Sequence, residues 1–476
     1  MEQNNEKLSF WTKLGYGLGD IYGGGASTII SFYYLLFLTD VVRLSPGLAG
    51  TVILISKIYD SITDPFEGVL SDRTRTPWGR RRPYLAAGVL LIFISFIALF
   101  YPVSAESEAA RFAFVLATYL FYSTVVSIVM LNYNALQAEL TLDYNERTAL
   151  SSFRIFFSTA SSIVCALVPM EIVNAMPDVR TGWMVMGVSI GLFFALPFIA
   201  TVVIARERPE FQRPLQPFHW RQAFVDPFTV KTFVFVLVMY VTAFASFDAT
   251  SSLVAYFVKT YLGRGSEVSY VLGTLLVMQV ISLPFYVWLS RKTSKPRSYM
   301  VGAAGFAVVM IFSFLVTPSA PDPAVYILAA MLGLSSGGVV MMVYAIFPDI
   351  PDVDELRSGE RREGIYSALT TFIRKLSSAI AIFAVAQVLN FGGYVAPLEQ
   401  AGKLVEQPQS TTFIFALRSA FALLPIALIA FGVLFASRFP LTIELYRRME
   451  TVLNAQRAGQ PVDETERQAL IKKLIG

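Results

Sequence analysis

The chain contains about a dozen apolar stretches, each long enough to cross a lipid bilayer. Two examples run from Tyr84 to Val103 and from Phe413 to Phe435. A helix needs roughly 20 mostly apolar residues to cross about 30 Å of hydrocarbon, and soluble core helices do not need such runs. Only 15% of the residues are charged, whereas a soluble domain has about 25%. The apolar stretches therefore predict an integral membrane protein.

We expect twelve transmembrane helices in this chain. Their approximate bounds are 12–39, 46–70, 84–103, 112–139, 149–173, 182–204, 231–258, 268–289, 299–317, 324–347, 363–388 and 411–437. The longest central loop is rich in arginine and proline, which is typical of a linker. This layout predicts an N-terminal six-helix bundle over 1–204, a cytoplasmic central loop over 205–230, a C-terminal six-helix bundle over 231–438 and a cytoplasmic tail over 439–476.

Positive charge predicts the orientation of the helices. If both termini are cytoplasmic, the outer loops carry only Arg43, Arg111, Arg180, Lys259, Arg264 and Lys403. The inner loops then carry most of the remaining loop arginines and lysines, as the positive-inside rule requires. We therefore expect a multi-pass protein of the plasma membrane, the inner membrane in a bacterium, surrounded by membrane lipid. No cleavable signal pattern precedes the first span, so that span must direct insertion.

Several classes of function are disfavoured by what the chain lacks. Its single cysteine, Cys165, excludes an internal disulfide, and its single histidine, His219, excludes histidine relays and histidine metal sites. No phosphate-binding loop of the Gly-x-x-x-x-Gly-Lys-Ser/Thr type is present. The net charge of +4 follows from the basic inner loops and is no sign of nucleic-acid binding. We expect no enzyme activity and no cofactor.

A short internal echo favours a carrier over a channel or a receptor. Ala149-Leu150-Ser151-Ser152-Phe153 opens the fifth span, and Ala368-Leu369-Thr370-Thr371-Phe372 opens the eleventh. Each stretch follows an acidic loop that contains Glu-Arg. Corresponding positions in two six-helix halves are typical of a duplicated transporter.

The second span carries an unusual group of charges. Lys57, Asp60 and Asp64 are spaced i, i+3, i+7 and therefore share one helix face. A charge at membrane depth costs at least about 2.5–3.5 kcal/mol, so this face must look toward water, an ion or another charge. A lysine–aspartate pair that only holds helices together is one interpretation. It leaves one carboxylate over, which could bind a cation or accept a proton.

Other polar or flexible positions within the spans allow two interpretations each. The glycines of the first span, from Gly15 to Gly25, could permit close helix packing or let the helix bend around a substrate. Arg154 could bind a substrate or pair with a lipid phosphate. Arg374 and Lys375 could line a cavity or extend toward the interface, and the latter fits Arg374 better. Asp248 favours a cavity, because an acid facing lipid is costly.

The second span and the loop after it also carry an extended motif. Asp60-x-x-x-Asp64-Pro65 is followed by Gly68-x-x-Ser71-Asp72-Arg73-Thr74-Arg75 and by Trp78-Gly79-Arg80-Arg81-Arg82-Pro83. The loop resembles the signature loop of the major facilitator superfamily. The longer pattern resembles the glycoside–pentoside–hexuronide:cation symporters, the melibiose permease group. Similar stretches include Thr39-Asp40-Val41-Val42 and Glu360-Arg361-Arg362-Glu363, and the resemblance extends from about residue 12 to 440.

The resemblance implies an all-α membrane protein with the major facilitator fold. It implies a symporter coupled to Na⁺ or H⁺ that moves a glycoside or related sugar derivative by alternating access, as a functional monomer. It implies a cation site at Asp60 and Asp64, with Lys375 nearby, and a possible Na⁺ there is the only metal expected. We expect Asp72, Arg73, Arg80 and Arg81 to govern the conformational change by gripping helix ends or lipid phosphates.

The substrate site cannot be copied from that group. Gly24 and Met130 occupy the positions near which its type member has sugar-binding acids on the first and fourth helices. Our candidates for binding a small-molecule substrate are instead Asp20, Tyr16, Asn132, Asn134, Arg154 and Asp248. Asp20 could alternatively be an interfacial residue. Because the sugar-binding acids are missing, the rival hypothesis is a cation-coupled carrier of lysolipids or other amphiphiles, since the broad family is also similar to vertebrate lysophospholipid symporters.

Overall fold

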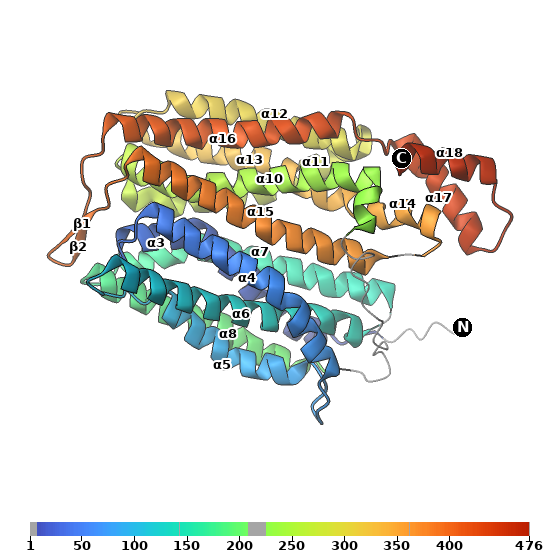
Figure 1. Cartoon of the computed structure of the whole chain (residues 1–476), viewed down its shortest axis with the longest axis horizontal. Coiled ribbons are helices and arrows are strands. Elements are labelled where there is room, and N and C mark those ends of the chain that lie inside the picture. The colour runs from blue at the N-terminus through green and yellow to red at the C-terminus, as the bar shows by residue number, and fades with distance from the viewer. Residues whose placement is uncertain (1–6, 142, 208–224, 361, 476) are drawn as a thin grey trace. The chain divides into compact units, whose positions relative to one another are not determined.

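The computed structural model describes residues 7–141, 143–207, 225–360 and 362–475, and nearly all elements are helices (Figure 1). Most of the predicted central loop, with His219, and Arg361 lie outside the described residues. The elements up to residue 261 are α1 (Phe10–Leu18), α2 (Asp20–Ile29), η1 (Ile30–Tyr34), α3 (Leu35–Asp40), α4 (Pro46–Arg73), α5 (Arg82–Leu99), α6 (Glu108–Leu140), α7 (Tyr144–Asn174), α8 (Val179–Ile204), η3 (Asp226–Thr229), α10 (Lys231–Tyr256) and η4 (Phe257–Tyr261). The later elements are η5 (Gly265–Glu267), α11 (Val268–Lys292), α12 (Lys295–Phe312), η6 (Ser313–Leu315), α13 (Asp322–Ile346), α14 (Asp349–Ser358), α15 (Glu363–Gly392), β1 (Leu398–Gln400), β2 (Lys403–Val405), α16 (Thr411–Ser437), α17 (Ile443–Arg457) and α18 (Glu464–Leu474).

The helices follow the predicted spans closely. Within the described residues, eleven helical stretches are long and apolar enough to cross a membrane. The second predicted span corresponds to α4, which has 28 residues but is not among the eleven. Its charged residues, which include Lys57, Asp60 and Asp64, make it much less apolar than its neighbours. The prediction of a helical membrane protein is confirmed, and a membrane-spanning α4 stays a prediction.

The glycine-rich first span packs closely against α7. A Cβ atom added to Gly24 would lie 2.4 Å from the backbone oxygen of Ser158, and one added to Gly25 would lie 2.3 Å from the hydroxyl of Ser161. Both serines belong to α7, against which α2 packs. The assigned helix α1 ends at Leu18 and α2 begins at Asp20, with Gly19 between them in helical conformation. Close packing at these glycines is therefore confirmed, and bending of the helix around a substrate stays a prediction.

The chain forms two compact units. The first comprises residues 1–216, 251–273 and 382–417, and the second comprises 217–250, 274–381 and 418–476. In the first unit α2 packs on α7, α5 packs on α6 and α8, and α4 packs on α6. Segment 251–273 joins it through contacts such as the 3.2 Å hydrogen bond from Ser252 to the backbone oxygen of Ser31. These boundaries differ from 204 and 231, so the division into two six-helix bundles stays a prediction.

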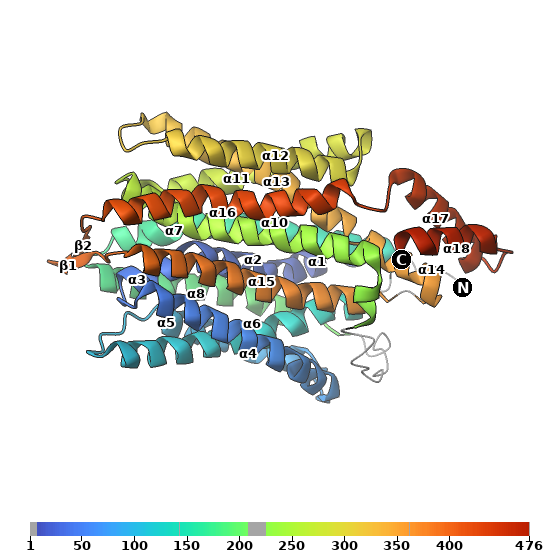
Figure 2. The same cartoon turned by 45° about the horizontal axis from the view of Figure 1, so that its top comes forward.

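Helices of the second unit also pack through small residues. α12 and α13 lie side by side (Figure 2). A Cβ atom added to Gly333 of α13 would lie 2.2 Å from the backbone oxygen of Leu275 of α11. The predicted tail contains α17 and α18, which pack against α14 (Figure 1). Arg457 donates to Glu355 at 2.8 Å, and Arg467 donates to the backbone oxygen of Leu356 at 2.9 Å.

The close packing of α2 on α7 can be tested with a single methyl group. We expect Gly24→Ala to lower the thermal unfolding midpoint of the purified protein, because overpacking costs about 1–3 kcal/mol and the opposing backbone oxygen cannot turn away. Gly364→Ala is the matched control, since open space surrounds that glycine in α15. Equal midpoints for the two variants in the same detergent would contradict the packing described here.

Candidate cation and substrate sites

Asp60 lies at the contact between α4 and α6. Its side chain is buried, with 1% of the residue exposed. One carboxylate oxygen accepts a 2.9 Å hydrogen bond from the ammonium group of Lys57, and the other accepts a 2.5 Å bond from the hydroxyl of Ser123 on α6. The ammonium nitrogen lies 5.9 Å from the ring centroid of Tyr119. The pair within α4 is therefore formed, as the spacing allowed.

Asp64 adds a second carboxylate to this pair. It lies one turn further along α4 and is partly buried. One lysine and two aspartates give this stretch of α4 a formal charge of −1. Carboxylate and hydroxyl oxygens are suitable ligands for a hard cation. Lys375 lies partly buried in α15 of the second unit, and its participation in a cation site stays a prediction.

Arg154 of α7 binds polar groups from two other helices of the first unit, α2 and α6. Its Nε donates to Asp20 at 3.0 Å, one terminal nitrogen donates to Gln137 at 2.9 Å, and the other donates to Asn134 at 2.5 Å. Its guanidinium carbon lies 4.8 Å from the ring centroid of Tyr133. This Arg154 cluster combines hydrogen-bond donors and acceptors and rests on a buried aromatic ring, which is a suitable composition for a polar ligand site.

Two buried tyrosines support the Arg154 cluster. The rings of Tyr16 and Tyr133 stack with centroids 4.7 Å apart. Each hydroxyl donates to the other residue's backbone oxygen, at 2.9 Å from Tyr16 and 2.7 Å from Tyr133. Because both residues are 0% exposed, Tyr16 positions the cluster from behind.

The remaining substrate candidates lie elsewhere. Asn132 is buried, and its side-chain oxygen faces Arg81 at 3.5 Å, so it belongs to the basic loop and not to the Arg154 cluster. Asp248 lies in the second unit and pairs with Arg374. The prediction that Arg374 extends toward the interface is therefore wrong, because its charge is bound to an acid within the helices. Sequence reasoning missed Gln137, although it is placed three residues after Asn134 and therefore shares its helix face.

The basic loop after α4 grips helix ends. Arg80 donates to Glu139, in the last turn of α6, at 2.6 and 3.0 Å. Arg81 donates to the same carboxylate at 3.3 Å and also to Asp72. Arg73 is exposed. The sequence identified the three arginines and Asp72 but gave no signal for Glu139, because its role depends on how α6 meets the loop.

Glu207 holds the beginning of α5. Its carboxylate accepts backbone N–H groups from Arg80, Arg81 and Arg82 at 2.7, 2.7 and 2.8 Å. These groups lie at the N-terminus of the helix, which attracts negative charge. Gly79 has φ +102°, and a Cβ atom there would lie 2.5 Å from the carboxyl carbon of Glu207. The backbone of the Gly-Arg-Arg-Arg sequence therefore binds the carboxylate of Glu207 at the beginning of α5.

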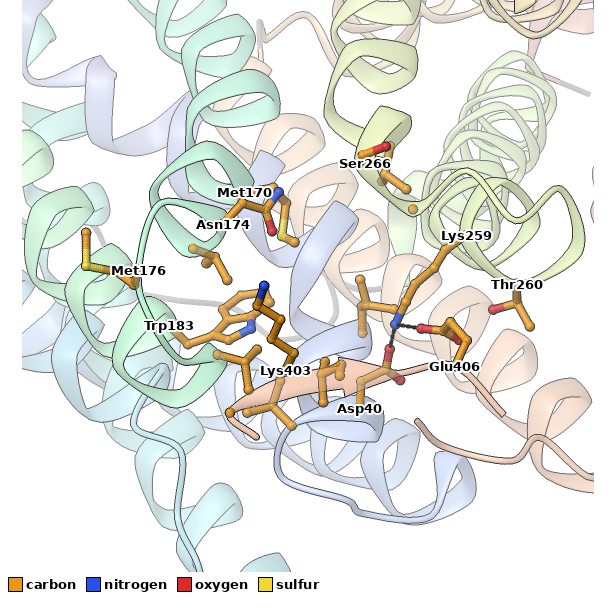
Figure 3. Close-up of a pocket in the computed structure, with 18 of the residues that line it drawn as sticks. Asp40, Met170, Asn174, Met176, Trp183, Lys259, Thr260, Ser266, Lys403 and Glu406 are labelled. Carbon is orange, nitrogen blue, oxygen red and sulfur yellow. Dashed lines mark hydrogen bonds and ion pairs between the residues drawn. The ribbon is translucent and has the colours of Figure 1, made fainter. Parts of the chain in front are cut away.

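A second ionic cluster lies near the N-terminal end of α4 and involves α3, which precedes that helix. Lys259 of η4 is paired with Asp40 of α3, and with Glu406 at 2.7 Å (Figure 3). Asp40 also accepts hydrogen bonds of 2.7 Å from the hydroxyls of Thr39 and Tyr394. Burial and the charge of Asp40 raise the pKa of Tyr394 well above its ordinary value, so the phenol stays protonated and donates.

Asp40, Lys259, Glu406 and Tyr394 are called the outer ionic cluster, after the side on which the predicted orientation places them. The first three of these residues form one wall of a cavity. The cavity has a volume of about 710 Å³ and is wholly contained in the first unit. The other lining residues include Met170, Asn174, Trp183 and Lys403, the last from the β1–β2 hairpin (Figure 3). The cavity is therefore bordered by segments from both halves of the sequence.

Comparison with known proteins gives a consistent result. A family model described as "MFS/sugar transport protein" matches residues 15–443. An uncharacterized symporter of Synechocystis sp. is 27% identical over 96% of this chain and 99% of its own length. The glucuronide carrier protein homolog of Escherichia coli is 23% identical, with 96% and 98% coverage. The sodium-dependent lysophosphatidylcholine symporter 1-A of Danio rerio is 22% identical, with 93% and 88% coverage.

Solved structures show the same fold. An inward-facing bacterial homologue of the iron transporter ferroportin has a TM-score of 0.62 at 16% identity, covering 91% of this chain and 99% of its own. The inward-open xylose transporter XylE of Escherichia coli has a TM-score of 0.59 at 14% identity, with 87% and 94% coverage. The predicted major facilitator fold is thereby confirmed.

The outer ionic cluster yields a stability prediction. We expect Lys259→Met to lower the thermal unfolding midpoint strongly, because it leaves Asp40, which is 1% exposed, without its cation. Breaking a buried pair in this way costs about 3–5 kcal/mol. Lys403→Met is the control, since that lysine lines the same cavity but is exposed. If both variants unfold at the same temperature, the pair does not hold these segments together.

Proposed function

The chain belongs to the MFS/sugar transport protein family, and from this premise we propose that it is a secondary symporter that couples Na⁺ or H⁺ to a glycoside or related sugar derivative. It is an integral, multi-pass membrane protein, which we place in the plasma membrane with both termini cytoplasmic. In this proposal Asp60 and Asp64 hold the coupling ion. The Arg154 cluster holds the substrate.

The observation that carries the proposal is the pair of carboxylates that α4 places one helical turn apart. Asp60 is buried and bonded to Lys57 at 2.9 Å and to the hydroxyl of Ser123 at 2.5 Å, and Asp64 adds carboxylate oxygens on the same helix face. Carboxylate and hydroxyl oxygens are suitable ligands for a hard cation. Each positive charge that enters the cell across 100 mV contributes about 2.3 kcal/mol to transport. The site can thus use the membrane potential.

The Arg154 cluster supplies what a sugar ring requires. Arg154 and Asn134 present hydrogen-bond donors and acceptors, and Asp20 accepts from Arg154 while remaining 13% exposed in its side chain. Sugar hydroxyls donate and accept in the same way. The pair of Arg154 and Asp20 has a formal charge of zero, so the cluster suits an uncharged, hydroxyl-bearing ligand.

Alternating access needs contacts that close each side in turn. The basic loop and the outer ionic cluster flank opposite ends of α4, whose 28 residues span about 42 Å at 1.5 Å per residue. Under the predicted orientation, the loop lies on the cytoplasmic side and Asp40 on the outer side. We propose that the basic loop closes the cytoplasmic side of the transporter and that the outer ionic cluster closes the opposite side during the transport cycle.

A lysolipid or similar amphiphile is the second candidate substrate. It is favoured by the likeness to a relative named as a lysophosphatidylcholine symporter. The polar Arg154 cluster favours a sugar derivative, because an acyl chain would find few apolar partners among its side chains. Binding assays with glycosides, uronides, sulfosugars and lysolipids, with and without Na⁺, separate the two.

Neutralising the α4 acids tests the coupling site. We expect Asp60→Asn and Asp64→Asn to stop gradient-driven accumulation in proteoliposomes, because the site no longer requires a cation. Both variants should still exchange substrate at equilibrium, since the Arg154 cluster is intact. Full accumulation by both variants would overturn the assignment, and so would loss of expression in both, which would indicate a structural role.

The basic loop should act on the rate of transport. We expect Asp72→Ala to slow uptake while substrate affinity stays near that of the wild type, because Asp72 pairs with Arg81 of the basic loop. The measurement compares the initial rate of uptake with equilibrium binding. Normal uptake combined with weakened binding would show that this role is wrong.

A further inference from the structure

The outer ionic cluster borders a cavity that the proposed function has not used as a binding site. The cavity has a volume of about 710 Å³ and lies within the first unit. Small-molecule sites have volumes of about 300–1,000 Å³. Leu36, Met170 and Val173 give the cavity apolar walls, and two of its lining residues, Asn174 and Lys403, are exposed. The cavity is therefore large enough for a small ligand and accessible to one from the solution.

Three of the lining residues carry hydrogen-bond donors. They are Asn174 at the end of α7, Trp183 of α8 and Lys403 of β2. In the view of Figure 3 the side chain of Lys403 extends from the hairpin across Trp183 toward Asn174. Within the part of the chain that the structure describes, none of these three side chains has a hydrogen bond or an ion pair. An ammonium group and an indole nitrogen can only donate, so the cavity favours a ligand that brings acceptors.

Docking of the β1–β2 hairpin holds Lys403 in place before any ligand binds. The backbone N–H group of Val179, the first residue of α8, donates to the backbone oxygen of Gly402 at 2.8 Å. Gly402 has φ +76°, and a Cβ atom there would lie 2.9 Å from the Cβ atom of Asp178. The turn of the hairpin thus packs tightly against the beginning of α8. Trp183 lies one turn further along the same helix, so the two donors are positioned by one contact.

The acids of the cavity do not neutralise Lys403. Asp40 and Glu406 are both paired with Lys259, and Figure 3 shows the three side chains meeting at its ammonium group. Because these acids border the same cavity, a ligand with two negative charges would be repelled more strongly than one with a single charge. The unpaired ammonium group of Lys403 therefore favours a monoanion.

We propose that this cavity is a binding site for a monocarboxylate with an apolar body. Lys403, Asn174 and Trp183 donate to the carboxylate, and the bond from the ammonium group is strengthened by charge. The apolar body packs against Met170 and Val173, since a methionine adapts to the shape of its neighbours. The site shares no residue with the Arg154 cluster or with the acids of α4. It is a ligand site in addition to the proposed substrate and cation sites and does not depend on them.

The test uses 2-naphthoate and 2-naphthamide, which share one apolar ring system and differ in charge. Equilibrium binding is measured by calorimetry at neutral pH on the full-length protein in phosphatidylcholine nanodiscs, with empty nanodiscs as the blank. We expect the wild type to bind the carboxylate at least about tenfold more tightly, the effect of a hydrogen bond to a charged group. Equal or tighter binding of the amide overturns the proposal, and so does the absence of binding by both probes.

Two variants change the charge of the site. Lys403→Met removes the ammonium group and keeps an unbranched side chain, and Asn174→Asp places a negative charge where the amide donated. We expect each to weaken naphthoate binding by about ten- to a hundredfold, while naphthamide binding stays near that of the wild type. Lys403→Arg keeps the charge and should retain most of the affinity for naphthoate. Wild-type affinity for naphthoate in both Lys403→Met and Asn174→Asp overturns the proposal.

A matched control removes the same charge elsewhere. Lys472 of α18 is exposed, belongs to the second unit and does not line the cavity. Lys472→Met should therefore bind naphthoate as the wild type does, and an equal loss in this variant would show a general effect of net charge and overturn the proposal. Because Lys403 is exposed and unpaired, Lys403→Met should also keep the thermal unfolding midpoint of the wild type. Loss of naphthoate binding at an unchanged midpoint is the result that supports the site.

Discussion

The desolvation of charge is the constraint on which this structure depends. A charged side chain among apolar helices is several kcal/mol unfavourable unless it finds a partner or water. Arg154 pairs with Asp20, Arg374 with Asp248, and Lys259 with Asp40. Every one of these pairs joins segments more than a hundred residues apart in the sequence. The ion pairs therefore specify which helices meet, and they do so where apolar packing alone would discriminate poorly.

The charged groups differ in how their charges balance. The pairs of Arg154 with Asp20 and of Arg374 with Asp248 are formally neutral, so they offer hydrogen bonds without requiring an ion. The group on α4 places the carboxylates of Asp60 and Asp64 one turn apart, with Lys57 bound to the first. In our proposal these two carboxylates hold the coupling ion, and the neutral Arg154 cluster contacts the substrate.

The sequence predicts most of the helices because the signal is local. A run of about twenty apolar residues identifies a span without knowledge of its neighbours. The pairing of Lys57 with Asp60 was also predictable, since i, i+3 spacing places both on one face. The same rule could have separated Asn132 from Asn134, because residues two apart on a helix do not share a face. In the structure the side-chain oxygen of Asn132 faces Arg81, and that of Asn134 accepts a hydrogen bond from Arg154.

Partners between helices were beyond the reach of one sequence. Asp248 and Arg374 are 126 residues apart, and nothing local says that an arginine near the start of α15 meets α10 and not lipid. Glu139 and Glu207 were missed for the same reason, although they bind the loop whose arginines were predicted. The internal echo does not supply this pairing either. Arg154 directly follows the Ala149–Phe153 stretch, whereas Arg374 lies two residues after the matching Ala368–Phe372 stretch, so the two arginines do not occupy matching positions and differ by about 100° around the helix.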